Sequence, residues 1–408
     1  MTGKPLPVPA TGEPAPASVT GAAVPDVLSP GRIGPLRLRN RTVKAATFEG
    51  RSDGGLVTDE LVAFHRAVAA GGVGMTTVAY CAVAPEGRTQ YDQIWMRPEA
   101  APGLRRLTEA VHAEGAAASA QLGHAGPVAN PRSNRLPALG PSRRFNQLGG
   151  RFTRAATPAD VDRIVRAHGT AAELAVESGF DAVEVHLGHN YFASSFLSPR
   201  INKRRDAYGG SLENRAKVAR AAVRAVRDAV GDRIAILAKF NMDDGVGGGF
   251  WLDEALRVAR WIEADGSVDA LELTVGSSLL NPMYLFKGPA PVRDFAAALP
   301  QPQRLGVRLV GGRFLREYPY RDAFLLEEAR QFRAALDLPL VLLGGITGRA
   351  AMDLAMAEGF QFVAMARALL REPDFVDRVR RESAARSLCV HCNKCMPTNF
   401  SGTRCVLA

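Results

Sequence analysis

"DAVEVHL" (181–187), "LENRAKVARAAVRAVRDAVG" (212–231) and "IAILAKF" (234–240) follow one another along the chain and decide its fold. The first and third are short, largely apolar runs, which are typical of strands buried on both faces. The second places apolar residues three and four positions apart, which predicts an amphipathic helix. A strand, a helix and a second strand in this order form the unit from which parallel sheets are built.

The same alternation recurs along the rest of the chain. Amphipathic stretches separate short apolar runs at 41–47, 74–82, 116–122, 181–187, 234–240, 268–274, 339–345 and 361–366. Eight buried strands that alternate with helices are the count of a closed barrel. A doubly wound open sheet is the alternative, but it normally carries a Gly-rich turn after its first strand, which is absent here. We therefore predict an α/β fold, a (β/α)8 TIM barrel with a short C-terminal cysteine-rich segment.

The chain divides into three segments by composition. Residues 1–27 are rich in Pro, Ala and Thr without periodicity, so we expect a disordered leader. The expected barrel occupies residues 28–385. Residues 386–408 hold four of the five cysteines.

Composition also excludes some classes of protein. The formal charge is +10, but the arginines are scattered among alanines and acids at helical spacing, so we expect no nucleic-acid partner. No run approaches the ~20 apolar residues that cross a bilayer, and the first residues do not resemble a signal peptide. We expect no membrane contact and a cytoplasmic protein.

Polar side chains gather where the predicted strands end, which is the end of a barrel that carries the chemistry. His186, His189 and Tyr191 follow the fourth strand. Two imidazoles and a phenol can hold a polar oxygen and deliver a proton. A zinc site is disfavoured because no third ligand of matching spacing lies nearby. The glycines of "GGI" (344–346) suit a phosphate site formed by backbone N–H groups.

Four stretches resemble the Old Yellow Enzyme family of FMN-dependent oxidoreductases. They are "GFDAVEVHLGHNYFASSFLSPRINKRRDAYGGSLENRAK" (179–217), "QLGHAG" (121–126), "AGGVG" (70–74) and "LGGIT…AMARALLREPDF" (343–375). The resemblance covers residues 28 to 380. It implies a barrel that holds FMN, takes hydride from NAD(P)H and reduces the activated C=C bond of an α,β-unsaturated carbonyl compound.

The resemblance also implies roles for single residues. His186 and His189 match the pair that hydrogen-bonds the substrate carbonyl, and Tyr191 matches the proton donor. Lys239 stands where the family usually has arginine, which keeps the positive charge beside the flavin but loses the planar fork. The expected cofactor-binding residues are Ala45, Ala46, Thr47, Tyr80, Gln121, Lys239, Gly344, Gly345, Ala366 and Arg367.

The tail reads "CVHCNKC" at 389–395 and ends its cysteine series at Cys405. Such close spacing suits an iron–sulfur cluster or zinc. It resembles the [4Fe-4S] segment of 2,4-dienoyl-CoA reductases and trimethylamine dehydrogenase, which would make Cys389, Cys392, Cys395 and Cys405 the ligands. Structural zinc and unoccupied thiols are the alternatives. Those relatives continue into nucleotide-binding domains, whereas this sequence stops at Ala408, so we expect a separate electron-transfer protein as a partner.

Three functions follow from these observations. The first is an ene-reductase with an enone or related small molecule as substrate and a nicotinamide nucleotide as reductant. The second is an amine- or dienoyl-type dehydrogenase that passes electrons from FMN through the cluster. The His-x-x-His-x-Tyr order favours the first, because a cationic amine would prefer an aromatic cage. The third is a flavin-free lyase or binding module. We also expect a homo-oligomer.

Overall fold

The computed structural model describes residues 24–146, 150–301 and 303–408. Most of the expected leader, residues 1–23, lies outside the described residues, and Val27 is buried against the core. Eight parallel strands close into a barrel in the order β11-β12-β13-β14-β15-β3-β6-β7. They are β3 (Thr42–Lys44), β6 (Met75–Ala82), β7 (Ala117–Gly123), β11 (Ala182–Leu187), β12 (Ala235–Asn241), β13 (Ala270–Thr274), β14 (Leu340–Leu342) and β15 (Phe362–Met365). Each overlaps one of the eight predicted runs, so the barrel is confirmed and the open sheet is excluded.

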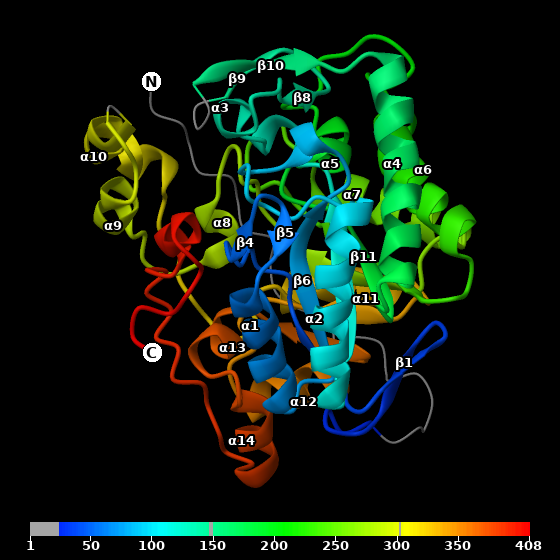
Figure 1. The fold of residues 1–408 in the computed structure, drawn as a ribbon, viewed down its shortest axis with the longest axis vertical. Helices are drawn as coiled ribbons and strands as arrows, with labels where there is room; N and C mark the ends of the chain where they lie inside the picture. The colour runs from blue at the N-terminus through cyan, green and yellow to red at the C-terminus, as the bar shows by residue number, and fades with distance from the viewer. Residues whose placement is uncertain (1–23, 147–149, 302) are drawn as a thin grey trace, which may run out of the picture.

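Helices cover the outside of the barrel (Figure 1). They are α1 (Asp59–Ala70), α2 (Ala101–Ala113), α4 (Pro158–Glu177), α6 (Leu212–Val230), α7 (Leu252–Ala264), α11 (Leu326–Ala335), α12 (Arg349–Ala357), α13 (Arg367–Arg371) and α14 (Phe375–Arg381). Helix α6 shows why the sequence forms them. The Ser211 side chain caps its first turn by accepting from the N–H of Asn214, and Gly231 ends it with φ +56°. No helix of the described residues is long and apolar enough to span a membrane.

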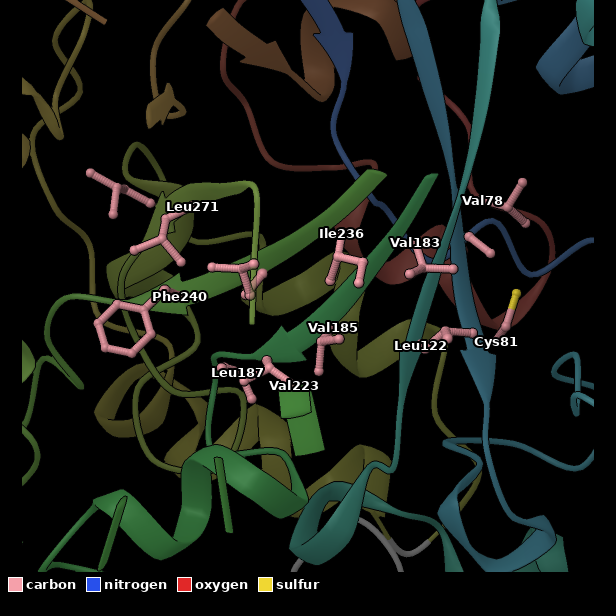
Figure 2. Close-up of a cluster of buried hydrophobic side chains, with 14 of the residues drawn as sticks. Val78, Cys81, Leu122, Val183, Val185, Leu187, Val223, Ile236, Phe240 and Leu271 are labelled. Carbon is pink, nitrogen blue, oxygen red and sulfur yellow. The ribbon is translucent and has the colours of Figure 1, made fainter. Parts of the chain in front are cut away.

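Alternate residues of each strand face the helices and the barrel interior. Val183, Val185 and Leu187 of β11 pack with Ile236 and Phe240 of β12 in the layer between barrel and helices (Figure 2). The residues between them, Glu184 and His186, therefore point inward, because successive strand side chains face opposite sides. The apolar residues thus bind the helices to the barrel, while the interior is free to carry polar groups.

An N-terminal hairpin closes the amino-terminal end of the barrel. Strands β1 (Gly31–Ile33) and β2 (Leu36–Leu38) pair antiparallel. Ile33 and Leu38 are buried and join an apolar cluster with Leu237 and Phe362 from the barrel strands. This layer fills the lower part of the barrel, so the polar residues above it lie nearer the mouth.

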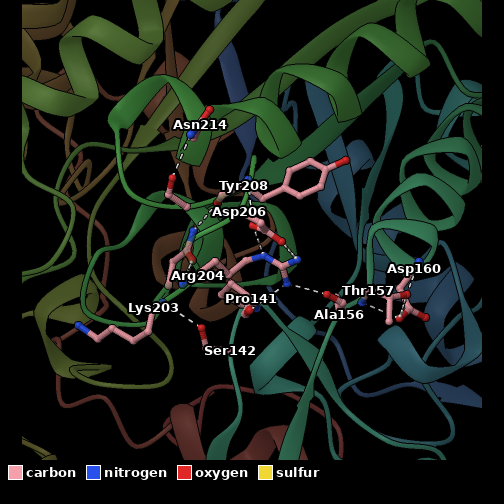
Figure 3. A network of polar contacts seen from close by, with 12 residues as sticks. Pro141, Ser142, Ala156, Thr157, Asp160, Lys203, Arg204, Asp206, Tyr208 and Asn214 are labelled. Atoms are coloured by element: carbon pink, nitrogen blue, oxygen red, sulfur yellow. Dashed lines mark hydrogen bonds and ion pairs between the residues drawn. The ribbon is translucent and has the colours of Figure 1, made fainter.

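A small sheet and a long loop build one side of the mouth. The sheet contains β8 (Leu139–Gly140), β9 (Arg144–Asn146) and β10 (Arg151–Ala155). Arg204 donates to the carbonyls of Pro141 at 3.2 Å and Ala156 at 2.6 Å and pairs with Asp206 (Figure 3). Arg204 and Asp206, from the charged part of the 179–217 stretch, therefore fix the small sheet against the loop that follows β11.

An insertion after β13 forms the other side of the mouth. It contains α8 (Met283–Phe286), α9 (Val292–Ala297) and α10 (Gln303–Phe314), and it lies beside the C-terminal tail with its 3-10 turn η4 (Met396–Phe400) (Figure 1). The rings of Phe295 and Phe400 lie 5.9 Å apart and join the two segments. The remaining elements are β4 (Ser52–Asp53), β5 (Leu56–Val57), α3 (Pro131–Asn134), α5 (Phe192–Leu197) and the 3-10 turns η1 (Pro85–Gly87), η2 (Pro98–Ala100) and η3 (Gly126–Val128).

Candidate active site

A cavity of about 870 Å³ opens at the carboxyl-terminal ends of the barrel strands. It brings together every residue that the sequence assigned to catalysis or to the flavin. These are Ala45, Ala46, Thr47, Tyr80, Gln121, His186, His189, Tyr191, Lys239, Gly344, Gly345, Ala366 and Arg367. They come from seven barrel strands or the loops that follow them, so the barrel alone gathers residues more than 300 positions apart in sequence.

Three aromatic side chains form one contiguous group in this cavity. The ring centres of His186 and Tyr191 are 4.3 Å apart, and those of His186 and His189 are 5.1 Å apart. Tyr80 packs against Tyr191 at 5.4 Å, and its hydroxyl donates to the carbonyl of Gly87. Among the described residues, none forms a hydrogen bond with the hydroxyl of Tyr191, which lines the cavity and remains available to a ligand.

An unusual loop sets the direction of the His189 side chain. His189 and Asn190 have φ values of +59° and +58°, a left-handed conformation that is uncommon for non-glycine residues and that Asn and His adopt more readily than most. The Asn190 side chain donates to Asp244 at 2.9 Å, and the N–H of Ser278 donates to the carbonyl of His189 at 3.1 Å. Contacts from neighbouring strand ends therefore hold two consecutive residues in an uncommon backbone conformation.

Burial sets the protonation states of the three side chains. Burial, His189 and Lys239 lower the pKa of His186 well below its usual range, and burial and Lys239 lower the pKa of His189 to about 3. Both imidazoles are thus neutral near pH 7 and can each donate one hydrogen bond. Burial raises the pKa of Tyr191, which keeps its phenol protonated. The site supplies uncharged donors and a proton-carrying phenol.

Lys239 has two acidic neighbours inside the barrel that were not predicted from the sequence. Its ammonium pairs with Glu272 and lies 3.4 Å from Glu184, and Gln121 donates to Glu184 at 2.6 Å. All four residues are buried. Both glutamates occupy positions inside apolar strand runs, and only the barrel register places them beside Lys239.

The glycine pair fits a phosphate group. Gly344 and Gly345 have φ values of +97° and +78°. A Cβ at Gly345 would lie 2.6 Å from the backbone nitrogen of Ala323, and one at Gly344 would lie 2.7 Å from Leu325. Only glycine fits this backbone, which lines the cavity beside Ala366 and Arg367.

The buried Nδ1 of His186 also has no hydrogen-bond partner among the described residues, as expected of an atom that meets a ligand.

The tail cysteines converge, although not into a closed metal site. Cys389, Cys392, Cys395 and Cys405 line one small cavity of about 20 Å³, and Cys395 also lines the large cavity. Within the described residues no group of three or more His, Cys, Asp or Glu side chains is arranged to hold a metal ion. Burial raises the pKa of Cys395 to about 11. The donor set suits a soft metal, and its closed ligand arrangement is not formed in this structure.

The tail also contributes to the large cavity, which the sequence analysis did not anticipate. His391 stacks on Tyr320 with ring centres 3.5 Å apart, and both line the cavity. Arg367 donates to Asn393 and to the carbonyl of Phe286, and so ties the barrel to the tail and to the insertion. No local pattern in residues 386–408 predicts these contacts between the tail and the cavity, because they depend on where the chain returns to the barrel mouth.

Comparison with known proteins agrees with this arrangement. A profile of the "NADH:flavin oxidoreductase / NADH oxidase family" matches residues 26–275. The chain is 53% identical to the 4,4'-dithiodibutanoate disulfide reductase of Rhodococcus erythropolis over 95% of this chain and 96% of that protein. It is 30% identical to the NADH oxidase of Thermoanaerobacter brockii, of which it spans 53%.

A solved structure shares the fold. An old yellow enzyme homologue from Zymomonas mobilis superposes with a TM-score of 0.68 at 19% identity, over 90% of this chain and 96% of that one. The sequence similarity assigns the family, and the barrel, the cavity and the glycine pair are consistent with it. The chain belongs to the NADH:flavin oxidoreductase / NADH oxidase family and is an oxidoreductase of the NAD(P)H:flavin kind.

Proposed function

We propose that this enzyme uses NAD(P)H to reduce the activated C=C bond of a small α,β-unsaturated carbonyl compound. One observation carries the proposal, namely the contiguous group of His186, His189 and Tyr191 in the cavity. Bound FMN supplies the hydride after it has been reduced by NAD(P)H. In balance, the alkene, NAD(P)H and one proton give the saturated product and NAD(P)⁺.

The protein residues have distinct tasks in this reaction. The neutral imidazoles of His186 and His189 donate hydrogen bonds to the substrate carbonyl and so draw electrons from the alkene. The hydroxyl of Thr274 lies 3.0 Å from Nε2 of His189 and orients that ring. Tyr191 delivers the proton to the carbon that does not receive the hydride. Gly344, Gly345 and the Ala366–Arg367 segment would hold the FMN phosphate, and Gln121 and Lys239 its polar ring edge.

A second candidate reaction rests on the similarity to the Rhodococcus erythropolis protein, whose name describes a disulfide reductase. The same hydride source would cleave a small organic disulfide, and the disulfide, NAD(P)H and one proton would give two thiols and NAD(P)⁺. Sulfur is a weak hydrogen-bond acceptor, so the histidine pair would assist this reaction less than it assists a carbonyl substrate. The two reactions are therefore distinguishable through His186 and His189.

The His186→Ala/His189→Ala double variant tests the substrate-anchor role. It should bind 4-hydroxybenzaldehyde roughly 100-fold more weakly, because two hydrogen bonds to a charged phenolate are lost. Titration followed by the flavin absorbance measures the dissociation constant. His112→Ala is the matched control, because His112 lies on α2 outside the cavity and contacts Asp181. Unchanged affinity in the double variant would exclude the anchor role.

The choice of substrate is tested by an anaerobic stopped-flow comparison. Protein reduced with NADH or NADPH is mixed with 2-cyclohexenone and, separately, with a small disulfide dicarboxylic acid. Faster flavin reoxidation by the enone supports the proposal, and faster reoxidation by the disulfide replaces it with the second candidate. If heat-denatured protein releases no FMN, both reactions are rejected.

The four tail cysteines are proposed to hold a [4Fe-4S] cluster. The convergence of four thiols on one small cavity supports this assignment, since thiolates are the ligands of such clusters. Anaerobically purified protein should contain about four iron and four sulfide per chain, and Cys405→Ser should lower both. Cys81→Ser is the control, because Cys81 is buried in β6. One zinc per chain, or neither metal, would contradict the assignment.

A further inference from the structure

Lys239 belongs to a buried cluster in which one lysine lies beside two carboxyl groups. Its strand neighbours in register are His186 on β11 and Glu272 on β13. The ammonium pairs with Glu272 and lies 3.4 Å from Glu184. The side chains of Lys239, Glu184 and Glu272 are 3%, 1% and 0% exposed, so water screens none of them.

The two glutamates stand behind the lysine and away from the ligand space. Lys239 lines the large cavity, whereas Glu184 and Glu272 are absent from its described lining. Glu184 accepts from Gln121 at 2.6 Å. Oε2 of Glu272 has no hydrogen-bond partner among the described residues, and its carboxyl group lies beside both Lys239 and Glu184. Desolvation of buried ionisable side chains costs free energy that can exceed their mutual attraction, so this cluster is a weak source of stability.

The positive charge of Lys239 is nearly balanced by the negative charge of the neighbouring carboxyl groups. Burial lowers the pKa of Lys239, but the two carboxylates outweigh burial and the net shift is upward. Burial and the charge of Glu272 raise the pKa of Glu184 to about 8, so Glu184 is largely protonated near pH 7 and adds little to the negative charge beside Lys239. A second buried lysine, Lys44, also lies within electrostatic range, but it has its own partner in Glu49 at 2.5 Å. Lys239 is therefore positively charged, and adjacent negative charge offsets much of its field.

We infer that Glu272, together with Glu184, is a positioning residue that limits the positive charge Lys239 presents to the flavin. This inference rests on the proposed FMN site. A reduced flavin gathers negative charge on its pyrimidine edge, where a fixed cation stabilises it and raises the reduction potential. Carboxylates that pair with the cation from behind oppose this effect. The pair thus keeps the flavin a stronger reductant than Lys239 alone would allow, which favours hydride delivery to a substrate.

The test measures the midpoint potential of bound FMN in a series of variants. Glu184→Gln/Glu272→Gln removes both carboxyl groups, so that neither can carry a negative charge beside Lys239, and should raise the equilibrium constant for flavin reduction at least tenfold, which is about 30 mV for a two-electron couple. Glu272→Gln alone should raise it by a smaller factor, because loss of the Glu272 charge lets Glu184 release its proton and supply negative charge in its place. Glu272→Asp retains the charge and should stay near the wild-type value.

Glu49→Gln is the matched control, because it removes an equally buried carboxylate from Lys44 instead of Lys239. An unchanged potential in Glu272→Gln, or an equal rise in Glu49→Gln, would overturn the inference. If the double variant does not fold, the contrast between Glu272→Gln and Glu272→Asp decides the question. The FMN content of the wild-type protein is measured first. A wild-type protein without FMN would reject the proposed function, whereas a bound flavin with an unshifted potential would reject only this inference.

Discussion

The Tyr191→Phe variant is expected to reduce an activated alkene about 10²- to 10⁴-fold more slowly than the wild-type enzyme, while NAD(P)H reduces its flavin at nearly the wild-type rate. The reason is that only the alkene half-reaction needs a proton on carbon. The phenylalanine ring preserves the packing against His186 and Tyr80, whose ring centres lie 4.3 Å and 5.4 Å from that of Tyr191. Stopped-flow measurement of the two half-reactions separates the rates.

The cavity contains its own control for this experiment. Tyr80→Phe removes a second buried phenol from the same cavity, but that hydroxyl is engaged by the carbonyl of Gly87. We expect Tyr80→Phe to change the rate of alkene reduction much less than Tyr191→Phe. Equal slowing of both half-reactions in Tyr191→Phe would show a general disturbance of the site and would reject the proton-donor role. For a disulfide substrate we expect a smaller effect, because a thiolate leaves without strong proton assistance.

The Gly345→Val variant is expected to lose FMN, with affinity weakened roughly 100-fold or more. Gly345 has φ +78°, where a β-branched residue is strongly strained, and a Cβ there lies 2.6 Å from the nitrogen of Ala323 and 2.8 Å from the carbonyl oxygen of Arg321. Both neighbours are backbone atoms, so the segment must shift and take the phosphate cradle with it. Ultrafiltration followed by flavin fluorescence measures the retained FMN.

A second glycine of the cavity lining serves as the comparison. Gly306 lies in α10, and a Cβ there meets nothing within 4 Å. Gly306→Ala should keep FMN and should stabilise the helix slightly, because alanine has a higher helix propensity than glycine. Circular dichroism of both variants establishes that the barrel is folded. Full FMN retention in a folded Gly345→Val protein would contradict the assignment of the phosphate site.

The barrel strands and the residues at their ends could be predicted from short sequence patterns. The eight strands were predictable because each is a short apolar run between amphipathic stretches, as 181–187 and 234–240 show. The residues assigned to catalysis and the flavin were predictable for a related reason. They follow strand ends, and a closed parallel barrel brings all such ends to one face. Their roles came from the family resemblance and remain proposals that the variants above test.

Other features had no local signature. The insertion that contains α9 and α10 interrupts the last part of the barrel pattern, and its contact with Phe400 of the tail is a long-range one. Asp244 follows the strand that carries Lys239, yet its function as an acceptor for Asn190 depends on two loops that meet at the mouth. Such contacts are set by chain topology, which no single stretch encodes.

The sequence by itself determined the barrel, the positions of the polar strand ends and the presence of four clustered thiols, because these depend on periodicity and spacing within short segments. Only the tertiary structure decided which charges meet inside the barrel. Glu184 and Glu272 look like isolated polar residues in apolar strands, and the barrel register alone places both beside Lys239. The physical reason is that inward-facing side chains of neighbouring strands share a buried layer, where the energy of a charge depends on partners that are distant in sequence.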